Sequence, residues 1–309
     1  MTEHAAIGPV AVLGCGTVGA SWAALFVAHG HDVAAYDPGA GAEARLQTFL
    51  GPALEQLREL GVRGAGRLRF TSDLADALRG AAFVQENAPE NEGLKQAMLA
   101  EVEALTGAGV IVASSTSALL RSRITAACRE PGRFVVAHPF NPPHLVPLVE
   151  LVGEDEAIVE RAADFYRSLG RRPVVLRREM PGHIANRLAS ALYREAVFLV
   201  EQGVASVADI DAALCNGPGL RWAVMGPHMT YHLGGGPGGI AHYLAHLGPS
   251  QVRRWASLGS PALDAATQAK IVAGVAEEAR GRSVAELEAR RDRALIDLLK
   301  ARTEVAGEA

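Results

Sequence analysis

Short apolar runs alternate with amphipathic stretches along the first 180 residues of the chain. Runs of strand length occur at 9–13, 32–36, 67–71, 82–85, 110–113 and 134–137, with two more at 147–152 and 173–176. Between them, apolar residues at helical spacing predict helices at 17–29, 41–61 and 73–78. Strands that alternate with helices predict an α/β fold with a doubly wound, mostly parallel sheet.

The pattern changes after Met180-Pro181-Gly182, where strand signals stop. Helical patterns follow at 184–202, 206–215, 227–247 and from 261 to the end, and the glycine-rich run at 234–239 is predicted to be a loop. We therefore expect a sheet domain over 1–181 and a second, all-helical C-terminal domain over 182–309. Because a helical domain of this size has little core of its own, we expect it to pack on a partner subunit in a homodimer.

Composition narrows the functional classes. The 309 residues suffice for two domains. The net charge of -4 and the absence of a basic run argue against nucleic-acid binding. We find no signal peptide and no apolar stretch long enough to span a bilayer. Cys15, Cys128 and Cys215 are far apart, which fits a reducing cytoplasm. We expect a cytoplasmic protein that acts on a small molecule.

A glycine motif follows the first apolar run. Residues 14–19 read GCGTVG and open the first predicted helix. In this context Gly14 allows the tight turn, Gly16 lets backbone approach a pyrophosphate, and Gly19 lets the helix pack on the strand. Asp37 ends the second predicted strand, where a carboxylate can bind both ribose hydroxyls and repel a 2′-phosphate. These features predict a Rossmann-type domain that binds NAD rather than NADP.

A histidine and a carboxylate stand on two later strands. His138 follows the apolar run at 134–137, and ligands of open α/β sheets bind beyond the carboxyl ends of strands. Glu150 lies inside the apolar run at 148–152, where a carboxylate needs a partner. A carboxylate bonded to one ring nitrogen fixes the tautomer and stabilises the imidazolium that forms when the other nitrogen takes a proton. We therefore predict that His138 is a catalytic base paired with Glu150.

Six segments extend these motifs over nearly the whole chain. They are VLGCGTVGASWA at 12–23, ENAPENEGLK at 86–95, SSTSAL at 114–119, HPFNPPHLVPLVELV at 138–152, PGHIANRL at 181–188 and GPGLRWAVMGP at 217–227. In this order they resemble the 3-hydroxyacyl-CoA dehydrogenase superfamily, and within it the shorter branch of lambda-crystallin/L-gulonate 3-dehydrogenase and L-carnitine dehydrogenase. The resemblance implies an NAD-dependent dehydrogenase that oxidises the 3-hydroxyl of a small L-3-hydroxy acid or acyl thioester to a ketone.

The resemblance also implies roles for single residues. His138 matches the catalytic base and Glu150 its partner. Ser117 matches a serine that bonds the substrate oxygen, Asn186 an asparagine at the same site, and Asn141 a supporting asparagine. The residues implied to contact the cofactor are Gly14, Gly16, Thr17, Val18, Gly19, Asp37, Asn87, Glu90, Lys95 and Ser115.

The substrate is less closely determined. The CoA enzymes of the superfamily carry a lysine-rich helical hairpin after the second strand, whereas residues 39–70 contain no lysine. Arg221, shared with gulonate- and carnitine-type sequences, could hold a free carboxylate through two parallel hydrogen bonds. We therefore expect an L-gulonate- or L-carnitine-like free acid. The alternatives are 3-hydroxybutyryl-CoA as substrate and a non-enzymatic, crystallin-like structural role.

Two smaller patterns concern cations. A trimethylammonium group favours an aromatic cage, to which Phe198, Trp222, Tyr231 and Tyr243 could contribute. His242 and His246 are four residues apart, but no third ligand is evident nearby, so we expect no metal site.

Overall fold

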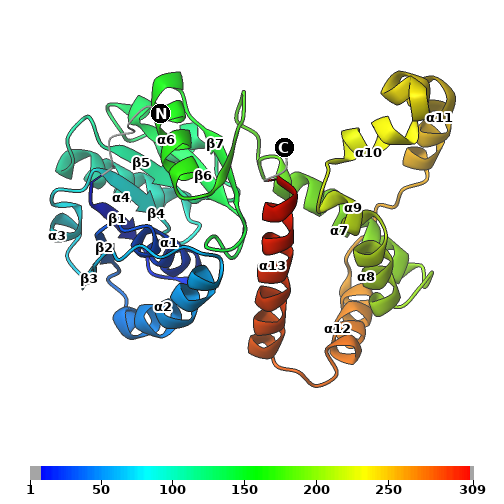
Figure 1. Ribbon diagram of the computed structural model, residues 1–309, viewed down its shortest axis with the longest axis horizontal. Helices are drawn as coiled ribbons and strands as arrows, with labels where there is room; N and C mark the ends of the chain where they lie inside the picture. The colour runs from blue at the N-terminus through cyan, green and yellow to red at the C-terminus, as the bar shows by residue number, and fades with distance from the viewer. Residues whose placement is uncertain (1–7, 307–309) are drawn as a thin grey trace. The chain divides into compact units, whose positions relative to one another are not determined.

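The computed structural model describes residues 8–306 and separates into two compact units (Figure 1). The first contains the residues up to Asn186 together with Asp292–Ala301, and the second contains Arg187–Arg291 and the residues after Ala301. The first unit is built on a sheet, and the second is helical. None of the described helices combines the length and apolar character needed to cross a membrane.

The sheet of the first unit has eight strands. They are β1 (Val10–Leu13), β2 (Val33–Tyr36), β3 (Leu68–Thr71), β4 (Phe83–Glu86), β5 (Ile111–Ser114), β6 (Phe134–Pro139), β7 (Leu148–Val152) and β8 (Arg172–Val175). Their order is β3-β2-β1-β4-β5-β6-β7-β8. Neighbours are parallel except β6 and β7, which are antiparallel. The predicted doubly wound, mostly parallel sheet is confirmed.

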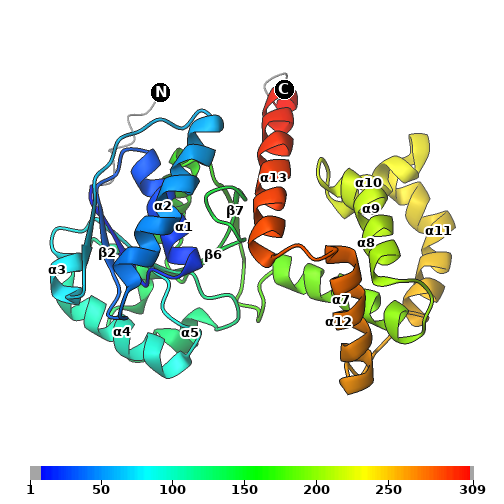
Figure 2. The same ribbon diagram turned by 90° about the horizontal axis from the view of Figure 1, so that it is seen from below.

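Helices cover both faces of this sheet (Figure 2). One face is covered by α1 (Thr17–Ala28) and α6 (Glu156–Ser168), with α2 (Ala42–Glu59) packed on α1. The other is covered by α3 (Leu74–Leu78), α4 (Glu92–Leu105) and α5 (Arg121–Ile124). In β1, Val10 and Val12 join the first core cluster and Ala11 and Leu13 the second. A strand with two buried faces reads as a continuous apolar run, as β1 does.

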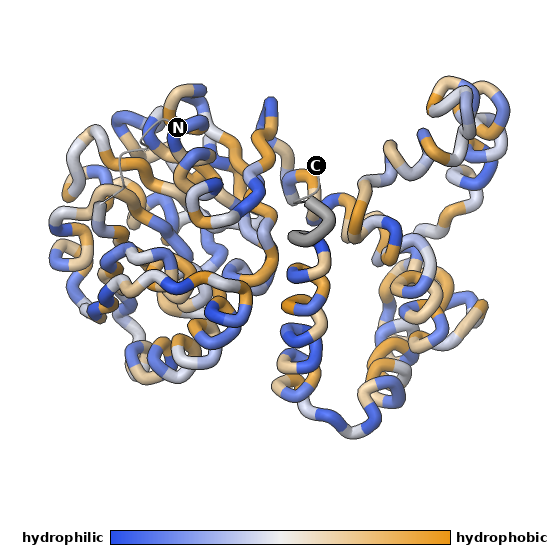
Figure 3. Tube along the Cα trace, in the orientation of Figure 1, coloured by the Kyte–Doolittle hydropathy of each residue, from blue (hydrophilic) through white to orange (hydrophobic). Residues whose placement is uncertain are grey.

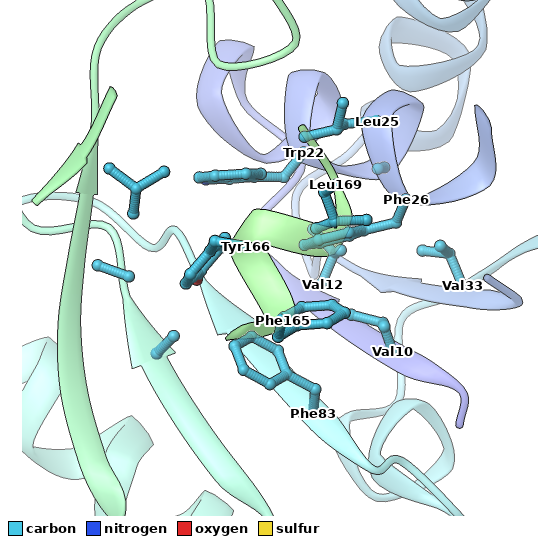
Figure 4. Packing of buried hydrophobic residues seen from close by; sticks show 14 of the residues in the cluster. Val10, Val12, Trp22, Leu25, Phe26, Val33, Phe83, Phe165, Tyr166 and Leu169 are labelled. Atoms are coloured by element: carbon cyan, nitrogen blue, oxygen red, sulfur yellow. The ribbon is translucent and has the colours of Figure 1, made fainter. Parts of the chain in front are cut away.

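Aromatic side chains fill the core between the sheet, α1 and α6 (Figure 4). The rings of Trp22 and Phe26 stack with centroids 5.6 Å apart, and Trp22 lies 5.4 Å from Tyr166. Phe83 of β4 packs 4.4 Å from Phe165. Each such side chain contributes about 1.5–3 kcal/mol when it is fully buried. This packing fixes α1, and with it the glycine turn at its start, against the strands.

One strand differs from its prediction in a way that concerns the site. The run predicted at 134–137 continues as β6 to Pro139, so His138 lies inside the strand and not beyond it. The extension arises because β6 pairs antiparallel with β7 as far as Pro139 opposite Val149. Pairing with a separate strand is a tertiary fact that the apolar run alone does not contain.

The second unit is all-helical, as predicted. Its core is small: within 187–291, Val197 and Tyr243 are the hydrophobic side chains that are buried. Apolar segments recur along its helices (Figure 3), and many of their side chains are exposed. The helices from residue 185 onward are α7 (Ala185–Glu201), α8 (Val207–Asn216), α9 (Pro218–Trp222), α10 (Pro227–Gly234), α11 (Gly239–Ala256), α12 (Ala265–Ala279) and α13 (Val284–Ala306).

Candidate active site

The glycine motif forms a tight turn between β1 and α1. Gly14 has a φ of +86°, and a Cβ added at Gly19 would lie 1.8 Å from the Gly14 carbonyl oxygen. A Cβ added at Gly16 would meet nothing within 4 Å. Gly16 also begins α1 without a side-chain cap, which leaves backbone N–H groups of the first turn for an anion. The turn therefore fits the pyrophosphate of a dinucleotide.

Asp37 lies beside this turn at the end of β2. Its Oδ2 accepts a hydrogen bond of 2.8 Å from Cys15 N, and its Oδ1 accepts one of 2.8 Å from Gly39 N. Each carboxylate oxygen still has acceptor capacity for a ribose hydroxyl. Burial, and after it the Asp37 charge, raise the pKa of Cys15 to about 12. The thiol in the glycine motif therefore stays neutral at physiological pH.

A chain of hydrogen bonds leads from the core to two predicted cofactor residues. The Tyr166 hydroxyl donates to Gln85 Oε1 at 2.5 Å, and Gln85 Nε2 donates to Ser115 Oγ at 2.9 Å. Ser115 Oγ in turn donates to Asn87 Oδ1 at 2.7 Å. The sequence predicted Asn87 and Ser115 but missed Gln85 and Tyr166, because their pairing joins α6 to β4, two elements far apart in the chain.

A buried ion pair lies under the same region. Lys95 Nζ donates to Glu86 Oε1 at 2.7 Å and to the Ala88 carbonyl oxygen at 2.9 Å. The Lys95 and Glu86 side chains are 1% and 0% exposed, so each charge depends on the other. Ser114 Oγ donates to the second Glu86 oxygen at 2.5 Å. The sequence predicted Lys95 and missed Glu86, the last residue of β4.

His138 and Glu150 face each other in the antiparallel register of β6 and β7. His138 Nδ1 lies 2.9 Å from Glu150 Oε2, and both side chains are buried. Because a carboxylate only accepts, Nδ1 carries the hydrogen of this bond, and Nε2 of the neutral ring is an acceptor. This arrangement is what a general base requires: one ring nitrogen is held, and the other is able to take a proton.

The second oxygen of Glu150 is also used. Glu150 Oε1 accepts hydrogen bonds from Ile184 N at 2.8 Å and Ala185 N at 3.0 Å, where α7 begins. Burial acts to raise the pKa of Glu150, but the bonds from His138 and from these two N–H groups outweigh it and lower the pKa. Glu150 thus stays ionised at neutral pH and ties the start of α7 to the histidine strand.

Glu90 holds the loop that carries Ser117. Glu90 Oε1 accepts from Thr116 Oγ1 at 2.6 Å and from the backbone N–H groups of Ser117 and Ala118 at 2.9 Å each. Its Oε2 lies 3.8 Å from Lys95 Nζ. The sequence associated Glu90 with the cofactor. The structure adds that one of its oxygens organises the backbone of the serine loop.

A cavity of about 490 Å³ brings most of the predicted site residues together. Glu150 lies behind His138. Asp37 lies at the neighbouring glycine turn. The predicted residues that line the cavity are Val18, Asn87, Glu90, Lys95, Ser115, Ser117, His138, Asn141 and Asn186.

The structure adds one histidine to which the sequence assigned no role. His183 is buried, with its ring centroid 5.0 Å from that of His138 and its Nε2 3.2 Å from the Thr116 carbonyl oxygen. It belongs to the PGHIANRL segment at 181–188, three residues before Asn186. Its place in this segment was the signal in the sequence that could have pointed to a role for His183. A ring contact with a residue 45 positions away, however, cannot be read from spacing.

The remaining predicted residues lie in the second unit. Arg221 is exposed in the last turn of α9. The rings of Tyr231 and Tyr243 pack on each other with centroids 4.8 Å apart. His242 and His246 stack at 4.0 Å, and within residues 8–306 no group of three potential metal ligands occurs.

The NAD-binding domain model of the 3-hydroxyacyl-CoA dehydrogenases matches residues 9–180, and the C-terminal domain model of these enzymes matches residues 182–270. The chain belongs to the 3-hydroxyacyl-CoA dehydrogenase family. As a member of this family it is an NAD-dependent oxidoreductase, and NAD is its cofactor.

The chain is also similar over most of its length to individual members of the family and to a solved structure. An L-carnitine dehydrogenase of Streptomyces griseus subsp. griseus is 49% identical over 94% of this chain and 89% of the relative. One of Nocardiopsis dassonvillei is 47% identical over 99% of this chain and 96% of the relative. A crystal structure of 5-formyl-3-hydroxy-2-methylpyridine 4-carboxylic acid 5-dehydrogenase, an NAD+-dependent dismutase, has a TM-score of 0.83 and 31% identity, covering 96% and 99% of the two chains.

Proposed function

We propose that this protein oxidises the 3-hydroxyl of L-carnitine to a ketone. The observation that carries the proposal is the near full-length similarity, at 47–49% identity, to two enzymes named L-carnitine dehydrogenase. The lysine-free stretch at 39–70 supports a free acid, because it offers no lysine to the phosphates of CoA.

In the proposed reaction His138 is the general base. Its Nε2 takes the proton of the 3-hydroxyl, and Glu150 stabilises the imidazolium through the bond to Nδ1. Ser117 and Asn186 line the same cavity and bind the hydroxyl oxygen, and Asn141 supports the histidine. A bound NAD supplies the hydride acceptor. A positioned base of this kind contributes roughly 10²–10⁴-fold to the rate.

The proposed cofactor contacts follow the geometry of the turn. Gly14, Gly16 and Gly19 with the uncapped start of α1 hold the pyrophosphate, and Asp37 binds the adenosine ribose. Of the rest of the proposed cofactor set, Thr17 is the first residue of α1. The others line the cavity: Val18, Asn87, Glu90, Lys95 and Ser115.

Variants of the dyad test the mechanism. His138→Asn should lower kcat by roughly 10²–10⁴-fold while NADH binding is retained, because the base is lost and the glycine turn is not. Glu150→Gln should cost at least about tenfold, since the imidazolium loses its counter-charge. His29→Asn, at the end of α1, is the matched control. A near-normal kcat for His138→Asn would falsify the mechanism.

A substrate panel tests the acid. The wild type should oxidise L-carnitine with a higher kcat/KM than L-gulonate or 3-hydroxybutyryl-CoA. We propose that Arg221 binds the carboxylate of the substrate. Arg221→Met should then raise KM for the free acid by one to two orders of magnitude, because it removes charge-assisted hydrogen bonds that contribute about 1.5–3 kcal/mol each. Arg253→Met, another exposed arginine of the second unit, is the control. A preference for the thioester would refute the free-acid proposal, and no turnover of any panel member would favour a crystallin-like role.

We also propose that the protein is a cytoplasmic homodimer that associates through its second unit. The exposed apolar side chains of that unit support association, with Leu220, Val224 and Val272 each 65–69% exposed. Cys15, Cys128 and Cys215 are free thiols, which suits a reducing compartment.

A further inference from the structure

His183 holds an unusual place in the first unit. Its φ is +49°, a left-handed conformation that few residues other than glycine adopt, and its side chain is 3% exposed. The next residues, Ile184 and Ala185, donate their N–H groups to Glu150 Oε1. The turn that carries His183 is therefore anchored to the carboxylate of the proposed dyad.

The hydrogen bond of His183 ends on the serine loop. Its Nε2 lies 3.2 Å from the carbonyl oxygen of Thr116, which belongs to the peptide group that joins Thr116 to Ser117. The N–H of the same peptide group donates to Glu90 Oε1 at 2.9 Å. One peptide plane is thus held on both edges, by a histidine at its carbonyl and by a carboxylate at its N–H. Because a peptide group is planar, fixing both edges fixes the direction of the Ser117 N–Cα bond. The bond from Ala118 N to the same Glu90 oxygen restrains the rotation about it, and together these bonds set where the Ser117 side chain leaves the backbone.

The two ring nitrogens of His183 differ in their hydrogen bonding, and within the described part of the chain only Nε2 has a partner. The Thr116 carbonyl only accepts, so Nε2 carries the hydrogen. Nδ1 is then a bare acceptor, buried and without a hydrogen-bond partner among residues 8–306. Burial lowers the pKa of His183 and keeps the ring neutral beside His138. A phenylalanine would place a ring here without an unpaired nitrogen, so what histidine adds at this position is the donor to Thr116.

We propose that His183 is a positioning residue, which together with Glu90 clamps the Thr116–Ser117 peptide and so sets the place of the Ser117 hydroxyl relative to His138. Its ring packs on the ring of His138, with centroids 5.0 Å apart, so the clamp and the base share one contact. The effect on catalysis rests on the proposed roles of Ser117 and His138. The clamp itself is a property of the fold.

Three substitutions distinguish the effect of losing the Nε2 hydrogen-bond donor from the effect of losing the ring. His183→Phe keeps a ring and removes the donor. His183→Gln removes the ring but places an amide N–H near the position of Nε2. His183→Asn accepts the left-handed backbone but is too short to reach Thr116. His29→Phe, a half-buried histidine that bonds the Leu25 carbonyl oxygen, is the matched control.

Two measurements are made on the full-length protein. Amide hydrogen exchange of the peptide over 114–119 should become faster in the Phe and Asn variants and stay near wild type in the Gln variant. With L-carnitine, kcat should fall roughly ten- to a hundredfold in the Phe and Asn variants, as expected for a misplaced substrate ligand, while the NADH dissociation constant is unchanged.

The outcomes are distinct. Unchanged exchange in His183→Phe, or equal losses in the Gln and Phe variants, would overturn the clamp. Faster exchange with an unchanged kcat would overturn its part in catalysis. A wild type that is inactive on every 3-hydroxy acid would refute the proposed function, whereas the exchange measurement would still decide the clamp.

Discussion

Asp32 and Asp37 flank β2, and their carboxylates lie in different surroundings. Asp37 follows β2 at the glycine turn and receives one backbone N–H on each carboxylate oxygen. Asp32 precedes β2 and pairs with Arg67 at 2.6 Å in an exposed position. A surface pair of this kind contributes little to stability, because solvent screens the two charges. Asp32 Oδ1 also accepts a backbone N–H, from Arg67 at 2.9 Å, so what distinguishes Asp37 is its place at the glycine turn, where we propose that it binds the ribose.

Asp37→Ala should therefore change cofactor selection. We expect the NAD dissociation constant to rise by about tenfold or more, as for the loss of one or two hydrogen bonds to a charged group, and the gap between NAD and NADP to narrow. Fluorescence titration with NADH and with NADPH measures the two dissociation constants and the gap between them. Asp32→Ala should leave both constants unchanged. A native protein that binds NADP as well as NAD would contradict the role given to Asp37.

Glu150 connects three elements. It lies on β7, bonds His138 on β6, and accepts two N–H groups where α7 begins. The pKa of Glu150 is lowered in the folded protein, since these hydrogen bonds outweigh the effect of burial. A carboxyl group with a lowered folded pKa stabilises the fold above its unfolded pKa, and this stability is lost as the pH falls towards the folded value.

The contribution of Glu150 should consequently depend on pH. Glu150→Gln should unfold more easily than wild type at pH 7, and the difference in the free energy of unfolding should shrink as the pH falls below about 4.5, the ordinary value for this carboxyl. Urea denaturation at a series of pH values measures it. Glu55→Gln, on the exposed side of α2, should show no such trend. A difference that stays constant down to pH 3 would contradict the ionised, hydrogen-bonded state.

At the scale of the whole molecule, the two units differ in how they bury apolar surface. The first has two continuous core clusters on the faces of its sheet. The second exposes large apolar side chains on several helices, and Val272 and Val275 lie one turn apart on α12 with 69% and 49% exposure. Exposed apolar side chains one turn apart on a helix support the proposed association through the second unit.

A dimer through the second unit should be sensitive to charge on such a face. Light scattering at micromolar concentration should give twice the mass of the 32.4 kDa chain. Placing two glutamates at Val272 and Val275 should weaken association, because burying unpaired charges is costly. Leu105→Glu, at an exposed site of the first unit, should leave the mass unchanged. A wild-type monomer would refute the dimer.

The sequence by itself was sufficient for the features whose cause is local. The alternation of apolar runs and amphipathic stretches predicted the strands, most of the helices and the doubly wound sheet. The spacing of apolar residues follows the repeat of a single helix or strand, which is a local property of the sequence. The glycine turn was predictable because backbone approach requires missing side chains at fixed spacing. His138, Glu150 and Ser117 came from motifs and resemblance, and their roles, like the division after residue 181, stay predictions.

The sequence predicted that His138 pairs with Glu150, but only the tertiary structure decided the strand geometry that joins them and the partners of Glu86 and His183. The antiparallel pairing of β6 with β7 places His138 opposite Glu150, and nothing in either apolar run states that direction. Glu86 within β4 gave no sign of its bond to Lys95, nor His183 of its bond to Thr116. The physical reason is common to all three. A buried polar group must be satisfied, but its partner is chosen by the three-dimensional packing of elements distant in the chain, and periodicity records only which side chains leave water.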